Sequence, residues 1–359
     1  MNLNRTYQFV GHLTTLEPLT VTLKGATVGK THKMPRNGDL GYFPASSFRG
    51  ALRHLAHKLV NDVLKAQNDG QPVLDLPEML MLAQGYFVKK EDMEQLSKSA
   101  KSTSTPVDQN LHLRLQNPMI SLFGRWGLNS KLGMGSAYTT RIEDTQVFHG
   151  GARTVLFERS PELLDDLTSD DVDRFYSFIA AQAETSVDVS EIKKERGALV
   201  KSLKTATNDE KDAINAQIND LDAQIKARKD SEVEATESLR RPLDGIEAIK
   251  AGIELKHRMA INDANPVELG LFLTTLAKFA RNPRLGGNTK LNFGHVHASW
   301  TISTWLNEDD FELTEIGRVS IDDSGIKIED LTDEGLLKNA IEDWKAASSS
   351  GKLNFKQYI

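Results

Sequence analysis

The stretch Phe43-Pro-Ala-Ser-Ser-Phe-Arg-Gly-Ala-Leu-Arg53 carries the clearest structural signal in the chain. A proline and two serines precede apolar residues with helical spacing, so the stretch predicts a helix start with Ser46 or Ser47 as N-cap. Arg49 and Arg53 lie four residues apart and therefore share a face of that helix. Free N–H groups at a helix start, serine hydroxyls and paired guanidinium groups all favour phosphate. The stretch therefore indicates a polyanion-binding site.

Two further basic segments are predicted to be loops. The first is the polar segment 25–43, which follows a strand-turn-strand pattern over residues 5–24. The second is the glycine-rich loop 284–294, between a predicted helix over 266–279 and a predicted strand over 296–305. Three such segments together favour a nucleic-acid backbone as partner. The candidate contacts in the loops are Lys24, Lys30, His32, Lys33, Arg36, Arg281, Arg284, Gly286, Gly287, Lys290 and Asn292.

The charge of the chain is unevenly distributed. Its 359 residues have a formal net charge of -6, but residues 1–60 hold eight Lys and Arg against two acids. Residues 270–300 carry four bases and no acid, whereas residues 301–359 carry six bases and thirteen acids. Local fields decide which partner a surface attracts, so the net negative charge does not exclude a polyanion.

The composition excludes several classes of protein. Cysteine is absent, which excludes disulfide frameworks, cysteine–zinc sites, thiol catalysis and iron–sulfur clusters. No apolar run approaches the ~18 residues of a membrane span, and the residues after Met1 do not form a secretory signal. We therefore expect a cytoplasmic protein that does not contact membranes.

Common catalytic and cofactor motifs are not matched. The segment Gly25-Ala-Thr-Val-Gly-Lys-Thr31 has one residue too few between its glycines for a phosphate-binding P-loop, and Pro35 follows where that motif needs a helix. His54 and His57 share a helix face, but they have no third metal ligand nearby in sequence. No Gly-x-Ser-x-Gly element occurs. We expect no metal, no cofactor and no catalytic residue.

The remaining segments predict an α+β core with long insertions. Strands alternate with two helices in the core, which favours a ferredoxin-like βαββαβ sheet. Gly50 would cost about 1 kcal/mol relative to alanine inside a helix, so it is expected to mark close packing against another backbone. The other predicted elements are one or two helices within 66–118, a strand over 137–147, a charged antiparallel helical hairpin over 189–234 broken at 205–209, a strand or hairpin over 246–261, and an acidic end with a hairpin and a helix near 333–347.

Three of these segments resemble a known family. The stretch 43–53 is similar to the proline-serine-serine signature of the repeat-associated RNA-binding (RAMP) superfamily of CRISPR systems. Ile120-Ser-Leu-Phe-Gly124 resembles a phenylalanine-glycine element of that superfamily, and Leu285-Gly-Gly-Asn-Thr-Lys-Leu-Asn-Phe-Gly-His295 resembles its C-terminal glycine-rich loop. Their order and spacing are most similar to the backbone subunit of multi-subunit effector complexes, and the helical insert to the type IV branch.

This resemblance implies a modified RNA-recognition palm with helical finger insertions, a thumb hairpin and the projecting antiparallel helical hairpin. It implies further RNA contacts at Arg125, Arg240, Arg241, Lys256 and Arg258, and it places His257 near the guide or target as well. The expected division is palm over 1–65, helical finger over 66–118, palm continuation and start of thumb over 119–160, helical insertion with its hairpin over 161–237, thumb over 238–262, second half of the palm with the glycine-rich loop over 263–305, and an acidic segment over 306–359.

The implied function is that of a guide-binding backbone in antiviral defence or plasmid interference. Copies of the chain would stack head to tail along a CRISPR RNA (crRNA) guide and present it for pairing with target nucleic acid, together with other effector subunits. Type III relatives that cut target RNA carry an aspartate in the loop before the serines. Residues 29–38 contain no acid here, so we expect binding without nuclease activity.

Three alternatives remain open at the level of sequence. His32 and Lys33 could support a metal-independent CRISPR RNA processing endonuclease. A type III-like backbone with target-RNA cleavage is a second alternative. The third is a scaffold whose basic loops bind the acidic residues 308–343 of a neighbouring copy.

Overall fold

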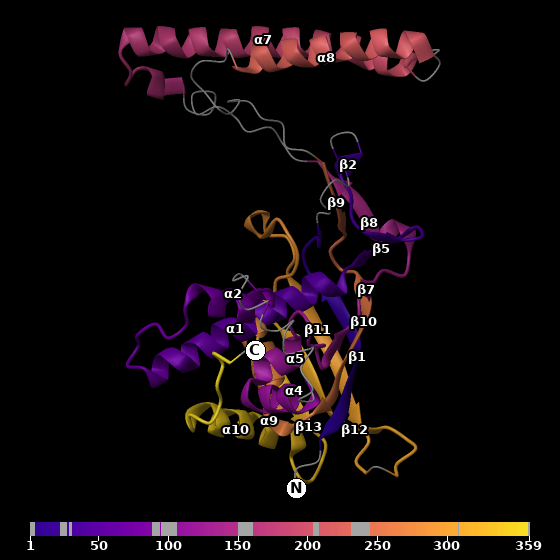
Figure 1. The fold of residues 1–359 in the computed structure, drawn as a ribbon, viewed down its shortest axis with the longest axis vertical. Coiled ribbons are helices and arrows are strands. Elements are labelled where there is room, and N and C mark those ends of the chain that lie inside the picture. The colour runs from indigo at the N-terminus through magenta and orange to yellow at the C-terminus, as the bar shows by residue number, and fades with distance from the viewer. Residues whose placement is uncertain are drawn as a thin grey trace. The chain divides into compact units, whose positions relative to one another are not determined.

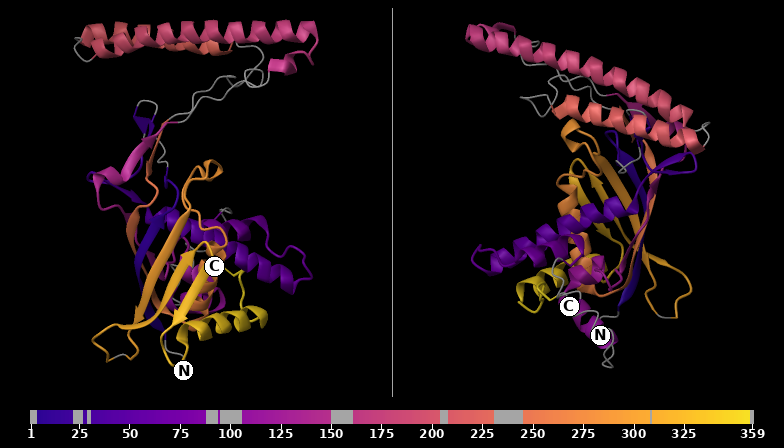
Figure 2. Two further views of the ribbon diagram at one scale, coloured as in Figure 1. Left: turned by 180° about the vertical axis from the view of Figure 1, so that it is seen from behind. Right: turned by 45° about the horizontal axis from the view of Figure 1, so that its top comes forward.

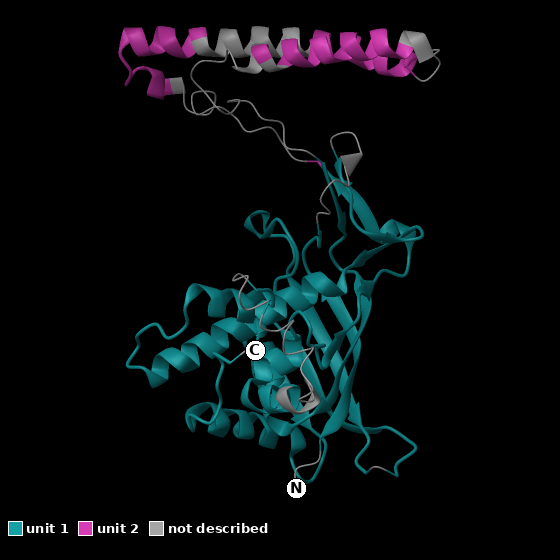
Figure 3. Cartoon of the chain, in the orientation of Figure 1, with its two compact units in different colours: residues 1–148, 245–359 teal, residues 149–244 magenta. Residues whose placement is uncertain are grey.

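The chain forms an α+β fold in two compact units. The computed structural model describes residues 4–21, 27–28, 31–87, 94, 106–149, 161–203, 208–230, 245–307 and 309–357. One unit contains residues 1–148 and 245–359, and the other contains residues 149–244 (Figure 3). All the predicted site residues that are described belong to the first unit.

The first unit is built on an antiparallel sheet centred on β1 (Arg5–Thr15). This strand pairs with β10 (Glu254–Ala264) on one side and with β11 (Val296–Thr304) on the other (Figure 1). Burial alternates along β1, with Phe9 inside and Val10 54% exposed, so the sheet has one core face and one open face. The strand order is β13-β12-β11-β1-β10-β7-β5-β4, with β6 also paired to β10. The remaining strands are β4 (Arg36–Asn37), β5 (Leu40–Phe43), β6 (Leu132–Met134), β7 (Ala137–Tyr138), β12 (Thr314–Asp322) and β13 (Gly325–Asp330).

Helices cover one face of this sheet. Helix α1 (Ala45–Gln67) and helix α9 (Pro266–Ala280) pack together against the core face, as the views in Figures 1 and 2 show. Since α1 follows β1 and α9 follows β10, the order β11-β1-β10-β7 is that of a βαββαβ unit. The smaller helices are α2 (Leu76–Gln84), α4 (Pro106–Gln116), α5 (Pro118–Phe123) and α10 (Leu336–Ser349).

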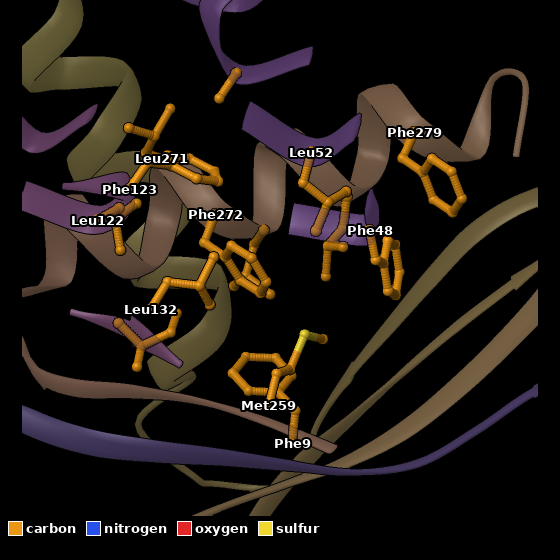
Figure 4. Close-up of a cluster of buried hydrophobic side chains, with 14 of the residues drawn as sticks. Phe9, Phe48, Leu52, Leu122, Phe123, Leu132, Met259, Leu271, Phe272 and Phe279 are labelled. Carbon is orange, nitrogen blue, oxygen red and sulfur yellow. The ribbon is translucent and has the colours of Figure 1, made fainter. Parts of the chain in front are cut away.

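Aromatic and aliphatic side chains fill the space between helices and sheet (Figure 4). Phe9 of β1 meets Phe272 of α9 edge to face, with ring centroids 5.4 Å apart. Phe48 of α1 lies 5.9 Å from Phe279 and 6.4 Å from Trp300. This shared core fixes the start of α1 relative to α9 and to β11, the strand that follows α9. Candidate site residues lie on α1 and on the glycine-rich loop between α9 and β11.

A second, small sheet interrupts two of the predicted strands. Its order is β2 (Thr27–Val28), β3 (Thr31–His32), β9 (Gly245–Ile249) and β8 (Thr145–Phe148). Strand structure over 246–261 is confirmed, but it is neither one strand nor a paired hairpin, because β9 belongs to the small sheet and β10 to the large one, with Gly252 at φ 78° between them. The predicted strand over 137–147 is likewise split by a 3-10 turn at Ile142–Asp144.

The start of α1 also differs from expectation. Pro44 occupies the N-cap position and no side chain caps the helix, so the prediction of Ser46 or Ser47 as N-cap is wrong. The carbonyl oxygen of Pro44 accepts hydrogen bonds from the N–H groups of Ser47 and Phe48 instead. Gly50 is exposed, and a Cβ built there would meet no atom within 4 Å. The expected close backbone packing at Gly50 is therefore also wrong.

The second unit consists mainly of two paired helices, α7 (Ser169–Ser202) and α8 (Asn208–Asp230). Arg196 of α7 makes a bidentate ion pair with Asp222 of α8, at 2.7 and 3.1 Å, and Ile218 and Leu221 are buried. The first helix begins about twenty residues earlier than the predicted Val189, because Thr168 caps it by accepting from the N–H of Asp171. Among the helices that the structure describes, none has the length and apolar content to cross a membrane.

Candidate nucleic-acid interface

The glycine-rich loop meets the segment after β1 and the residue that precedes α1. The N–H of Gly287 donates to the carbonyl of Thr20 at 2.9 Å, and the N–H of Gly294 donates to the carbonyl of Pro18 at 2.8 Å. A Cβ at Gly286 would lie 2.1 Å from the Thr20 oxygen and 3.2 Å from the ring of Phe43, the residue that precedes the start of α1. The glycine-rich loop therefore packs directly beside the α1 start and the segment after β1.

The glycine-rich loop is held by its own side chains. Arg284 donates to the carbonyl of Asn292 at 3.1 Å and to its side-chain oxygen at 2.6 Å. The side-chain amide of Asn292 donates in turn to Glu17 at 3.1 Å. Arg284 and Asn292, both predicted RNA contacts, thus shape the loop.

Gly286 is exposed at φ 77° and Lys290 is exposed, while Arg281 is exposed at the end of α9. The lysine and Arg281 are cations that a ligand can reach.

A second pair of reachable cations lies on the open face of the sheet. Lys256 and Arg258 are exposed on β10 and alternate with the buried residues Leu255, His257 and Met259. In the register of the sheet, Lys256 is opposite His12, and Arg258 is opposite Val10. Directly paired residues share a face, so both cations lie on the open face.

Lys33 and Arg36 are tied to a buried carboxylate. Glu247 of β9 is 3% exposed; its side chain accepts from the N–H of Met34 at 3.0 Å and from the guanidinium of Arg36. The ammonium of Lys33 lies 3.7 Å from the same carboxylate. Burial would raise the pKa of Glu247, but the bonds from Arg36 and Met34 outweigh it and hold that pKa below its usual range. One carboxylate thus faces both cations, so it offsets only one of their two positive charges while it ties Lys33 and Arg36 to β9.

Arg49 and Arg53 do not form the exposed guanidinium pair that the spacing predicts. Arg53 is 7% exposed and donates to the carbonyls of Leu82 at 2.7 Å, Met81 at 2.9 Å and Phe123 at 3.3 Å. Arg49 is half-buried and donates to the same Phe123 carbonyl. Burial, and secondarily repulsion from Arg49, lower the pKa of Arg53 to about 10. Arg53 thus satisfies the carboxyl ends of α2 and α5 and is not available to a phosphate.

The other predicted contacts are distributed over several environments. Arg125 is 8% exposed and donates to the carbonyl of Trp126 at 2.8 Å. Ser46 is exposed and Ser47 half-buried in the first turn of α1, while His32 is half-buried on β3. Four predicted contacts, Lys24, Lys30, Arg240 and Arg241, lie outside the described residues.

The expectation that His257 of β10 lies near the guide or target is wrong, because its side chain is buried in the core. His257 is 3% exposed and accepts from the indole N–H of Trp300 at 3.1 Å, while its other ring nitrogen lies 3.1 Å from the carbonyl oxygen of Gly135. Burial lowers its pKa to about 4, so the imidazole is neutral near pH 7. Its position between Lys256 and Arg258 in a strand with alternating burial is the signal that could have identified it as a core residue.

The part of the chain that the structure describes contains no ready metal-binding site. No group of three or more His, Asp or Glu side chains there is arranged to hold a metal ion. The exposed groups around the loop and the sheet face include cations and backbone amides, together with the carboxylates of Glu254 and Asp323, which lie against histidines. Such an arrangement can bind phosphates without requiring any sequence readout.

Comparisons with known proteins give weak similarity in structure and no match in sequence. No family model matches the sequence, and no curated protein matches it. Among solved structures, a chain of a "Type IV-B CRISPR Complex" aligns with a TM-score of 0.37 and 12% sequence identity, covering 86% of this chain and 94% of that chain. A TM-score of this size assigns neither a family nor an activity.

Proposed function

We propose that this chain binds a CRISPR RNA guide as the backbone subunit of a type IV effector ribonucleoprotein. Copies of it would associate head to tail along the guide and present the bases for pairing with target nucleic acid. In this proposal the βαββαβ unit acts as the palm, residues 66–118 as a finger and residues 238–262 as part of a thumb. The motifs at 43–53, 120–124 and 285–295 support this assignment through their resemblance to the superfamily.

The observation that carries the proposal is the meeting of the glycine-rich loop with the start of α1. These segments are separated by about 240 residues in sequence, yet Gly286 packs against Thr20 and Phe43. Exposed glycine backbone beside exposed Lys290 allows a phosphate chain to approach closely, because no side chain stands between the loop and the ligand. Lys256 and Arg258 on the open sheet face would extend the contact along the chain of phosphates.

Binding without cleavage is part of the proposal. Residues 29–38 supply no acid, and Lys33 is engaged with Glu247 at 3.7 Å. We therefore assign no catalytic role to this loop.

The direct test is co-expression of the chain with its guide array, followed by purification at moderate salt and sequencing of the bound nucleic acid. We expect guide-derived RNA in a high-mass assembly that falls apart with ribonuclease. Oligomers without RNA that resist nuclease would favour the scaffold alternative and contradict the proposal.

Cleavage is tested separately with labelled repeat RNA in EDTA. We expect the RNA to be retained and intact. Discrete products that disappear on substitution of His32 would instead establish the processing endonuclease.

A further inference from the structure

Two exposed aromatic side chains lie on adjoining turns beside the α1 arginines. Trp126 is 54% exposed and Tyr86 is 47% exposed. The N–H of Trp126 donates to the carbonyl of Gly85 at 3.1 Å, which joins the turn after α5 to the turn after α2. Single exposed apolar side chains are common on protein surfaces, but two large aromatic side chains on turns joined in this way are candidates for a ligand contact.

The turn that carries Trp126 is braced by backbone hydrogen bonds and by packing of its indole. Arg125 and Leu128 exchange backbone hydrogen bonds at 3.0 and 2.9 Å, with Gly127 at φ 77° between them. The ring of Phe87 meets Trp126 edge to face at 6.4 Å, and the guanidinium of Arg125 lies 5.7 Å from the centre of the Phe87 ring. The indole is therefore held in place before any ligand arrives, which lowers the entropy cost of binding.

Positive charge is concentrated beneath the aromatic pair. Arg49, Arg53 and Arg125 donate to backbone carbonyls of Phe123, Leu82 and Trp126, among others. Carbonyls satisfy the guanidinium donors but do not cancel their charge. After burial, repulsion from Arg49 is the next cause that lowers the pKa of Arg53, and repulsion from Arg114 is the next for Arg125.

The charge balance of the fourth guanidinium is different. Arg114 donates to the carbonyls of Ser121 at 3.2 Å and Asn129 at 2.8 Å, and it is also close enough to Glu268 and Asp263 to be stabilised by them. The excess positive charge therefore rests mainly with Arg49 and Arg53. An apolar protein segment would cover the rings but gain nothing from this field, whereas a polyanion with flat faces would use both.

We propose that Trp126 and Tyr86 form a stacking site for unpaired bases of a single-stranded nucleic acid, with its phosphates drawn by the arginines below. The proposal rests on the function proposed above and adds a base-contacting surface to its backbone-contacting loop. Every base has a π face, so such a platform binds without reading sequence. The arginines act at a distance, since their donors remain bonded to the protein.

The test is a binding titration with a labelled uridine dodecamer and an abasic dodecamer of the same length. Trp126→Ala should weaken binding of the uridine dodecamer by about ten-fold and leave the abasic strand unaffected. Trp126→Phe keeps an aromatic face and should bind within about three-fold of wild type. Phe311→Ala removes an aromatic side chain that is fully exposed elsewhere in the chain, and it should change nothing.

Fluorescence gives an independent readout. Trp300 and Trp344 are 1% and 2% exposed, so Trp126 is the better placed of these three indoles to be quenched by a stacked base. Wild-type emission should fall on titration with the uridine dodecamer, and Trp126→Phe should lose most of that decrease.

The outcomes separate this inference from the proposed function. If Lys290→Glu weakens binding and Trp126→Ala does not, the stacking site is wrong and the proposed function stands. If the wild-type protein binds neither strand at low salt, the proposed function fails and the stacking site with it.

Discussion

The arginines of α1 and the cations around the glycine-rich loop look alike in sequence but differ in the folded chain. Arg53 lies on a buried face of α1, and its guanidinium donates hydrogen bonds to three backbone carbonyls. Lys290 and Arg281 lie on a loop and at a helix end, and both are exposed. The comparison teaches that basic spacing alone does not identify a ligand site, because helix ends buried nearby compete for the same donors.

The largest effect should come from removing the guanidinium of Arg53. Arg53→Ala leaves the carbonyls of Met81, Leu82 and Phe123 without this donor, and we expect a loss of about 3 kcal/mol in the free energy of unfolding. Urea denaturation measures it. The matched control, Arg281→Ala, removes an exposed cation and should stay within about 0.5 kcal/mol of wild type. Equal losses for the two variants would remove the distinction between structural and reachable cations.

The buried histidine on β10 should make stability depend on pH. Burial lowers the pKa of His257 to about 4 in the folded chain, well below the value of about 6.5 of an exposed histidine. The unfolded state therefore binds the proton first as pH falls from about 6.5 to 4, and this group should cost about 3 kcal/mol of stability over that window. The measurement compares urea midpoints at pH 7 and pH 4.5 for wild type and His257→Gln. The variant should show a smaller difference between the two pH values; an unchanged difference would contradict the assignment.

Replacing either of two glycines by alanine should change the free energy of unfolding, in opposite directions for the two positions. Gly286→Ala places a Cβ 2.1 Å from the Thr20 oxygen at φ 77°, and we expect a loss of about 2 kcal/mol. Gly50→Ala meets open space inside α1 and should gain up to about 1 kcal/mol. Thermal unfolding of both variants checks the signs. A stable Gly286→Ala protein would mean that the loop does not pack on the α1 start.

The parts of the fold and of the site that could be predicted from sequence are those that depend on contacts between residues close in sequence. The helices α9 and α10, the charged hairpin and the strand β11 follow from periodicity and turn residues that act locally. The split between β9 and β10 could not be predicted, because it depends on pairing of β9 with β3 and β8 far away in sequence. The burial of Arg53 likewise requires knowing that α2 and α5 end beside α1. The exposed Trp126 gives no sequence signal that distinguishes it from the buried Trp300 and Trp344.

The salt dependence of RNA binding tests the central claim, that the reachable cations of the loop and of β10 contact phosphates. The measurement is the slope of log affinity against log salt for wild type and for the variant Lys256→Ala/Arg258→Ala/Lys290→Ala, with a labelled single-stranded RNA. Each lost phosphate contact should reduce the magnitude of the slope by about 0.7, so we expect a reduction of about 2 together with weaker binding at low salt. An unchanged slope and affinity would show that these residues are not the phosphate-binding surface and would contradict the account.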